Sequence, residues 1–120
     1  MPHLTLEYTC NLKHFNPADA LAAINQAMFD SGLFGEADIK SRAIALDTFQ
    51  IGVSAAPRAF AHVRIALLAG RSSQQRKTLA DAVLAALAVA VNGQIGTEIQ
   101  LSVETVELDR TSYAKAVING

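Results

Sequence analysis

Residues 59–84 of the chain read AFAHVRIALLAGRSSQQRKTLADAVL, and their pattern predicts a strand that is followed by a helix. In the first ten of these residues, apolar side chains recur at every second position, which is the period of a strand with one buried face. The side chains predicted on that face are Ala61, Val63, Ile65 and Leu67. Gly70 and Ser72 then supply a bend and an N-cap, and they predict a helix from about Gln74 to Val91. Apolar side chains lie on nearly every side of this helix, so we expect it to be deeply buried.

The N-terminal half of the chain shows the same order of elements. Alternation predicts a strand at 3–8, the N-cap candidate Asn16 precedes a helix from Pro17 to Gly32, and an extended segment covers 43–53. A fourth strand is centred on 99–103. We therefore predict a single domain over residues 1–120, with two βαβ halves at about 1–57 and 58–110 and a C-terminal tail at 111–120.

The predicted fold class is α/β, in which the two βαβ units form a four-stranded sheet with two helices on one face. The other face of the sheet is expected to be apolar. An apolar face of this kind is most simply covered by further copies of the chain, and charged residues make up only 18% of the sequence. The sequence therefore predicts a closed ring of identical subunits.

Composition limits the classes of function. A net charge of −1 with a pI near 6.3 gives no basic face, so no nucleic-acid partner is expected. The longest apolar run, Leu79–Val91, contains Asp81 and is too short to span a bilayer, so no membrane partner is expected. The single cysteine, Cys10, fits a reducing compartment, and the N-terminus shows no secretory signal. We expect a cytoplasmic protein.

Pro2 stands directly after Met1 at the head of the first strand, and two interpretations are open. In one, Pro2 is an edge residue whose nitrogen does not need to donate to the sheet. In the other, Met1 is removed and Pro2 becomes a free secondary amine, which is able to act as a base near pH 7. If Met1 stays, the nitrogen of Pro2 is an amide and neither accepts nor delivers a proton.

Four stretches of the chain carry a resemblance to a known family. They are MPHLTLEYTCNL, IKSRAIALDTFQIG, AFAHVRIALLAGRSSQQRKTLADAVL and LSVETVEL, and their order and spacing resemble the 5-carboxymethyl-2-hydroxymuconate isomerase family of the tautomerase superfamily. The resemblance covers nearly the whole chain. It implies a homotrimer of subunits built from two βαβ units, an N-terminal proline that acts as acid and base, and arginines that hold a substrate rich in carboxylates.

The resemblance assigns roles to particular residues. Pro2 occupies the place of the catalytic proline, and Arg71, in a Gly-Arg-Ser setting, matches an arginine of the family. Where the family has Ile-Arg-Ser-Arg, residues 39–42 of this chain read IKSR, so Lys40 replaces one arginine and Arg42 keeps the other. Lysine offers a point charge in place of a planar fork. We expect Lys40 and Arg42 on opposite faces of the sheet, with at most one of them in the pocket, and Arg42 is the reserve candidate for binding the substrate.

Phe49 corresponds to a bulky aromatic residue near the strand end in the family, and it is a candidate wall of the pocket. Arg71 lies just before a predicted helix, where free backbone N–H groups also favour an anion. The histidines, which are His3, His14 and His62, lack the spacing of metal ligands and are treated as structural. No metal and no cofactor are expected.

The predicted function is keto-enol proton transfer without a cofactor, on an unsaturated carboxylic acid such as 5-carboxymethyl-2-hydroxymuconate. Pro2 moves the proton, while Arg71 and Lys40 bind carboxylates and stabilise negative charge. The resemblance places this reaction in aromatic compound catabolism, in homoprotocatechuate degradation. Two alternatives remain open. One is the hydration of an unsaturated acid, in which a protonated Pro2 acts as an acid and a carboxylate activates water. The other is a trimeric binding protein without catalysis.

Overall fold

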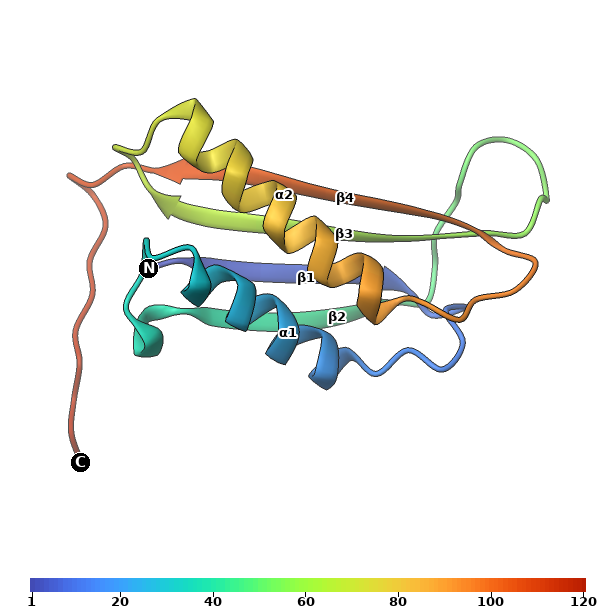
Figure 1. Cartoon of the computed structure of the whole chain (residues 1–120), viewed down its shortest axis with the longest axis horizontal. Coiled ribbons are helices and arrows are strands. Elements are labelled where there is room, and N and C mark those ends of the chain that lie inside the picture. Colours follow the sequence, from blue (N-terminus) through green and yellow to red (C-terminus); the bar gives the residue numbers. More distant parts are fainter.

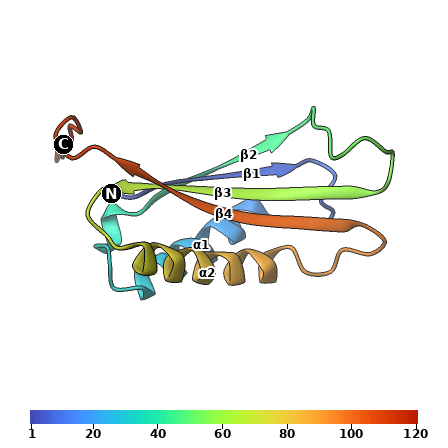
Figure 2. The same ribbon diagram turned by 90° about the horizontal axis from the view of Figure 1, so that it is seen from above.

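The computed structural model describes residues 1–120 as a four-stranded sheet with two helices on one of its faces (Figures 1 and 2). The elements, in chain order, are β1 (His3–Thr9), α1 (Pro17–Asp30), a 3-10 helix (Glu36–Asp38), β2 (Lys40–Leu46), β3 (Arg58–Leu68), α2 (Ser73–Ala90) and β4 (Glu98–Leu108). The predicted α/β class, with four strands and two helices on one face, is confirmed.

The order of strands decides which parts of the chain meet. It is β2-β1-β3-β4, with β1 parallel to β2, β3 parallel to β4, and β1 antiparallel to β3 in the centre. In the central pair, His3 lies opposite Ala66. As a result β1 and β2 begin at the end of the sheet where β3 and β4 finish. We call this the N-terminal end of the sheet.

The core lies between the sheet and the helices. Leu4 and Leu6 of β1 and Val63 and Ile65 of β3 have no exposed surface, as the two-residue period predicts. The buried residues of the helices are Ala20, Ile24, Met28, Leu79, Val83 and Leu87. Burial of each large aliphatic side chain stabilises the fold by about 1.5–3 kcal/mol. This packing fixes the strand ends on which the site is built.

Both helices begin where the sequence predicts. The side chain of Asn16 accepts a hydrogen bond from the backbone N–H of Asp19 (3.2 Å), and Pro17 occupies the first turn of α1. At α2, Ser72 and Gln75 form a reciprocal capping box.

The expectation that the helix after Gly70 is deeply buried is wrong. Only Leu79, Val83 and Leu87 of α2 are buried, and Val89 has an exposed fraction of 77%. These three residues are spaced four apart and therefore form one stripe that faces the sheet. Many of the other apolar residues of α2 are alanines, which a helix tolerates on an exposed face. None of the helices is long and apolar enough to cross a membrane.

The extended segment predicted at 43–53 also differs from the structure. The strand β2 covers Lys40–Leu46, and residues 47–57 form an irregular connection. The last ladder bond runs from the backbone N–H of Cys10 to the carbonyl of Leu46 (3.1 Å). Beyond this point β1 has ended, so the segment has no strand to pair with. Gly52, at a φ of 66°, then turns the backbone.

The face of the sheet opposite the helices is mixed, whereas an apolar face was expected. By register, the charged and polar residues that point away from the helices include Glu7, Arg42, His62, Arg64 and Glu104. The apolar Ile44, Phe60 and Val106 lie on the same face, and Ile44 has an exposed fraction of 46%. A wholly apolar face therefore no longer supports the prediction of a ring of subunits.

Candidate functional site

A pocket of about 380 Å³ lies at the N-terminal end of the sheet. Four parts of the chain form it, namely the residue ahead of Pro2, the turn before the 3-10 helix, the segment after β3 and the segment after β4. Its lining residues are Met1, Leu33, Phe34, Gly35, Asp38, Leu68, Arg71, Arg110, Tyr113 and Lys115. Three of these side chains are cationic and one is a carboxylate, so this N-terminal pocket favours an anionic molecule.

Pro2 is buried directly behind Met1, which lines the N-terminal pocket. The carbonyl of Pro2 accepts a hydrogen bond from the backbone N–H of Lys40 (3.2 Å), so the start of β1 is held against β2. The pKa of the terminal amine, which belongs here to Met1, lies below its ordinary value. Burial is the main cause, the charges of Lys40, Lys115 and Arg71 add to it, and the charge of Asp38 opposes it. An amine at this place therefore releases its proton more readily than an exposed one.

Arg71 lies in the N-terminal pocket, just after β3. One of its terminal nitrogens, Nη2, donates a hydrogen bond to the carbonyl of Leu33 (2.9 Å), and its guanidinium lies 4.8 Å from the ring centre of Phe34. These contacts hold the side chain in one position. A guanidinium has five N–H donors, so several remain for a carboxylate.

The start of α2 adds less to anion binding than the sequence suggested. The hydroxyl of Ser72 accepts a hydrogen bond from the backbone N–H of Gln75 (3.1 Å), while the backbone N–H of Ser72 donates to the side chain of Gln75 (2.9 Å). Two N–H groups that were expected to be free are thus occupied.

Lys40 and Arg42 lie on the same face of the sheet, so the expectation of opposite faces is wrong. Strand residues two positions apart share a face, and the register pairs Lys40 with His3 and Arg42 with Thr5. Lys40 Nζ donates to the carbonyl of Asp38 (3.0 Å), and Arg42 Nη2 lies 2.9 Å from Nδ1 of His3. Neither residue lines the N-terminal pocket. Lys40 nevertheless acts on the terminal amine through its charge.

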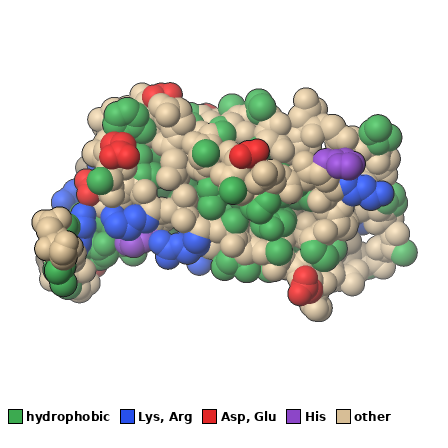
Figure 3. All heavy atoms as spheres, turned by 90° about the horizontal axis from the view of Figure 1, so that it is seen from below, with side chains coloured by type: hydrophobic (Ala, Val, Ile, Leu, Met, Phe, Trp, Pro, Cys, Tyr) green, Lys and Arg blue, Asp and Glu red, His purple; other side chains and the backbone are tan.

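Three pocket residues, Arg110, Tyr113 and Lys115, follow β4 and were not predicted as site residues. Lys115 Nζ lies 2.9 Å from a carboxylate oxygen of Asp38, and this contact lowers the pKa of Asp38 and raises that of Lys115. Arg110 Nε donates to the carbonyl of Ala69. Figure 3 shows several Lys and Arg side chains, with a histidine among them, at the end of the molecule where the C-terminal tail lies.

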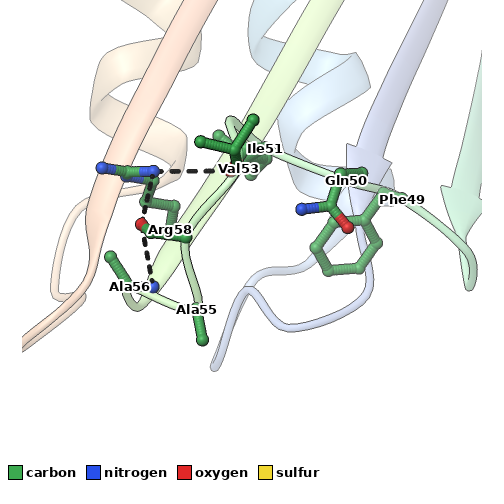
Figure 4. Close-up of a pocket in the computed structure, with 8 residues that line it drawn as sticks. Phe49, Gln50, Ile51, Val53, Ala55, Ala56 and Arg58 are labelled. Atoms are coloured by element: carbon green, nitrogen blue, oxygen red, sulfur yellow. Dashed lines mark hydrogen bonds between the residues drawn. The ribbon is translucent and has the colours of Figure 1, made fainter.

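Phe49 lies at the opposite end of the sheet. It follows β2, whose last residue, Leu46, pairs with Thr9 at the end of β1. A strand rises about 3.3 Å per residue, so roughly 20 Å separates this end from Pro2. Phe49 lines a second pocket of about 380 Å³ together with Arg58, as Figure 4 shows. Within one chain, Phe49 does not reach the N-terminal pocket.

The histidines have partners that the sequence did not suggest. Nδ1 of His62 lies 2.7 Å from the hydroxyl of Ser102, and its Nε2 contacts the carboxylate of Glu104. Arg64 Nε lies 3.5 Å from the same carboxylate. The chain holds no group of three or more His, Cys, Asp and Glu side chains placed to bind a metal ion.

A family model and a solved structure both match the chain to one protein family. The model of the 5-carboxymethyl-2-hydroxymuconate isomerase family matches residues 2–119. A solved 5-carboxymethyl-2-hydroxymuconate isomerase from Deinococcus radiodurans R1 is 31% identical, with a TM-score of 0.88, and the alignment covers 96% of this chain and 88% of that one. Comparison with curated protein sequences gives no match.

Two further solved structures show the same fold at lower identity. A 5-carboxymethyl-2-hydroxymuconate delta-isomerase is 16% identical, with a TM-score of 0.75 and coverage of 100% of this chain and 89% of that one. A fused 4-OT described as a wild type symmetric trimer is 19% identical, with a TM-score of 0.66 and coverage of 88% and 85%. At these identities the likeness concerns the fold alone.

Proposed function

The chain belongs to the 5-carboxymethyl-2-hydroxymuconate isomerase family, and from this premise we propose that it catalyses keto-enol proton transfer on an unsaturated di- or tricarboxylic acid. The proposed substrate is a dienol such as 5-carboxymethyl-2-hydroxymuconate, formed during aromatic compound catabolism in homoprotocatechuate degradation. The observation that carries the proposal is the N-terminal pocket, where a terminal amine with a lowered pKa lies among Arg71, Arg110 and Lys115.

Pro2 is the proposed acid and base. Removal of Met1 makes the nitrogen of Pro2 a secondary amine at the wall of the N-terminal pocket, because Met1 itself lines that wall and Pro2 is buried behind it. Burial and the charge of Lys40 lower the pKa of the present amine, and we propose that they lower the pKa of the Pro2 amine in the same way. A lowered pKa favours the neutral amine, which is the form in which an amine acts as a general base.

The reaction moves one proton and needs no change of oxidation state. The lone pair of Pro2 takes the hydroxyl proton of the dienol, and the electrons of that O–H bond form the carbonyl group. The double bonds shift, and a distant carbon takes the proton back from Pro2. Arg71 stabilises the negative charge that spreads over the conjugated acid, while Lys40 contributes through its field. Arg42 is proposed to act indirectly, because its guanidinium is directed at His3.

Hydration of an unsaturated acid is less well supported. It requires a carboxylate that activates water, and the carboxylate in the N-terminal pocket is that of Asp38. This group is paired with Lys115, and its pKa lies below the ordinary value. A carboxylate that binds a proton so weakly is a poor base. Proton transfer by Pro2 therefore remains the function that the geometry supports best.

We expect the processed protein to convert a 2-hydroxymuconate-type dienol to its ketone without an added metal or cofactor. An amine must be unprotonated to act as a base, so kcat/KM rises with pH through the pKa of the Pro2 amine and levels off above it. Burial and nearby cations place this pKa below the usual range of about 7.7–8.0. Absorbance of the dienol, followed from pH 5 to 9, measures the profile. A midpoint at or above the usual range contradicts the proposed base.

We also propose that the chain assembles as a homotrimer. Figure 2 shows that the connection between β2 and β3 and the C-terminal tail both project on the side of the sheet opposite the helices. The exposed fractions of Val53 and Ile118, one on each projection, are 103% and 90%. A trimer would bury these apolar side chains against neighbouring subunits. A relative of the same fold is a symmetric trimer.

Light scattering on the purified protein is expected to give three times the chain mass of 12.7 kDa. A trimer also gives Phe49 a route to a neighbouring N-terminal pocket, which it does not reach within its own chain. A particle of one chain mass at micromolar concentration contradicts the assembly and removes Phe49 from the proposed site.

A further inference from the structure

A chain of hydrogen bonds leads from β2 through β1 to the C-terminal tail. Arg42 Nη2 lies 2.9 Å from Nδ1 of His3, and Nε2 of the same ring lies 3.2 Å from the hydroxyl oxygen of Tyr113. The His3 and Tyr113 rings also meet edge to face, with 6.5 Å between their centres. Tyr113 lines the N-terminal pocket, whereas His3 and Arg42 do not. A residue of the pocket wall, Tyr113, is therefore held through its hydroxyl group by side chains that do not line the pocket.

The direction of these hydrogen bonds follows from the chemistry of the side chains. Arginine has only donors, so Nδ1 of His3 must accept from Arg42 with its lone pair. In a neutral imidazole the other nitrogen then carries the hydrogen, and Nε2 of His3 donates to the hydroxyl oxygen of Tyr113. The neutral form is also the favoured one, because burial and the charge of Arg42 lower the pKa of His3.

The hydroxyl hydrogen of Tyr113 is consequently not used in the contact with His3. The hydroxyl oxygen accepts from His3, and no acceptor in the chain receives its own hydrogen. The side chain is half-buried and shares the N-terminal pocket with Met1 and Arg71. A phenolic O–H with a fixed oxygen and a free hydrogen is a ready donor for an anionic oxygen in this pocket.

We propose that the Tyr113 hydroxyl donates a hydrogen bond to the reacting oxygen of the substrate, and that Arg42 and His3 are positioning residues that orient it. This inference rests on the proposed isomerase reaction. When Pro2 takes the proton of the dienol hydroxyl, negative charge grows on that oxygen, and a donor placed there lowers the barrier. The donor is oriented before the substrate arrives, so little reorganisation is needed during the reaction.

The test is the replacement of Tyr113 by phenylalanine, which removes only the hydroxyl group. The expected result is a loss of about tenfold in kcat with little change in KM, because the hydrogen bond strengthens as charge develops. Tyr8→Phe is the matched control. Tyr8 is a half-buried tyrosine of β1 that packs on Phe15, 4.9 Å between ring centres, and it does not line the N-terminal pocket. This control is expected to keep the wild-type kcat.

A double-mutant cycle separates positioning from a general structural effect. If His3 acts through Tyr113, His3→Ala lowers kcat in the wild-type background and causes little further loss in the Tyr113→Phe background. Losses that multiply in the double variant overturn the positioning role of His3. Circular dichroism and light scattering on each variant show whether fold and assembly are intact.

The outcomes distinguish this inference from the proposed function. If the wild-type protein is active and Tyr113→Phe has the same kcat, the inference is overturned and the proposed isomerase reaction still stands. An effect on KM alone overturns the role at the reacting oxygen, because it shows a contact made equally in the ground state. A change in the mass of the assembly shows that Tyr113 binds a neighbouring subunit instead. Inactive wild-type protein with Met1 fully removed overturns the proposed function and this inference with it.

Discussion

Replacing Arg71 with alanine is expected to lower kcat on a dienol carboxylate substrate by about 10²–10³. The guanidinium is fixed by the carbonyl of Leu33 and the ring of Phe34, so it is directed into the N-terminal pocket before substrate binds. A fixed cation in a partly enclosed pocket stabilises developing charge more strongly than a mobile one. Steady-state kinetics measure the loss. The cost to folding is about 1–2 kcal/mol, because one hydrogen bond to a backbone carbonyl and the contact with the ring of Phe34 are removed.

Two variants control for this result. Arg71→Lys keeps the charge but loses the planar fork, so an intermediate kcat is expected. Lys77→Ala removes one cation from the exposed surface of α2, where Lys77 pairs with Asp81 at 2.8 Å, and it is expected to keep wild-type kinetics. Kinetics of Arg71→Ala that match those of Lys77→Ala remove Arg71 from the site.

The local structure was predictable from the sequence because short-range patterns determine it. The two-residue period along β3 correctly predicted that Val63 and Ile65 are buried. The residue types of Asn16 and Ser72 correctly predicted the N-caps of the two helices. The predicted strand bounds were wrong where the length of a strand depends on the neighbouring strand with which it pairs. The segment after Leu46 has strand-forming residues, but β1 ends beside it and offers no further backbone groups.

The candidate site was predicted only in part, and the reason is topological. Pro2 and Arg71 follow from the family resemblance, and the structure brings Met1 and Arg71 into one pocket with Pro2 directly behind it. The presence of Arg110, Tyr113 and Lys115 in this pocket depends on the central antiparallel pair of β1 and β3, which no local pattern reveals. Once that pair is known, parallel β3 and β4 must both end near Pro2, so the residues after β4 become candidates.

A variant that keeps a residue before Pro2 is expected to lose about 10²–10⁴ in kcat/KM, which is the usual contribution of a general acid or base. Inserting alanine between Met1 and Pro2 produces such a chain after methionine removal. The nitrogen of Pro2 is then an amide without a basic lone pair. The new amine lies one residue away, about 3.8 Å along the backbone, and a displacement of even 1 Å is costly in proton transfer.

Pro2→Ala is the matched control for this variant. It leaves an N-terminal amine at the same position, but a primary one, provided that Met1 is still removed. Partial activity is therefore expected, well above that of the extended chain. Equal rates for Pro2→Ala and the extended chain would show that the position of the amine is irrelevant.

The most direct measurement combines intact mass with activity. Several preparations are made that differ in the fraction of chains lacking Met1. Intact-mass spectrometry measures this fraction in each preparation, and an assay measures its rate of ketonisation of the same dienol. We expect a rate proportional to the fraction of chains that begin at Pro2, with nearly no rate when Met1 is fully retained. Equal rates for chains with and without Met1 would show that the nitrogen of Pro2 is not the base.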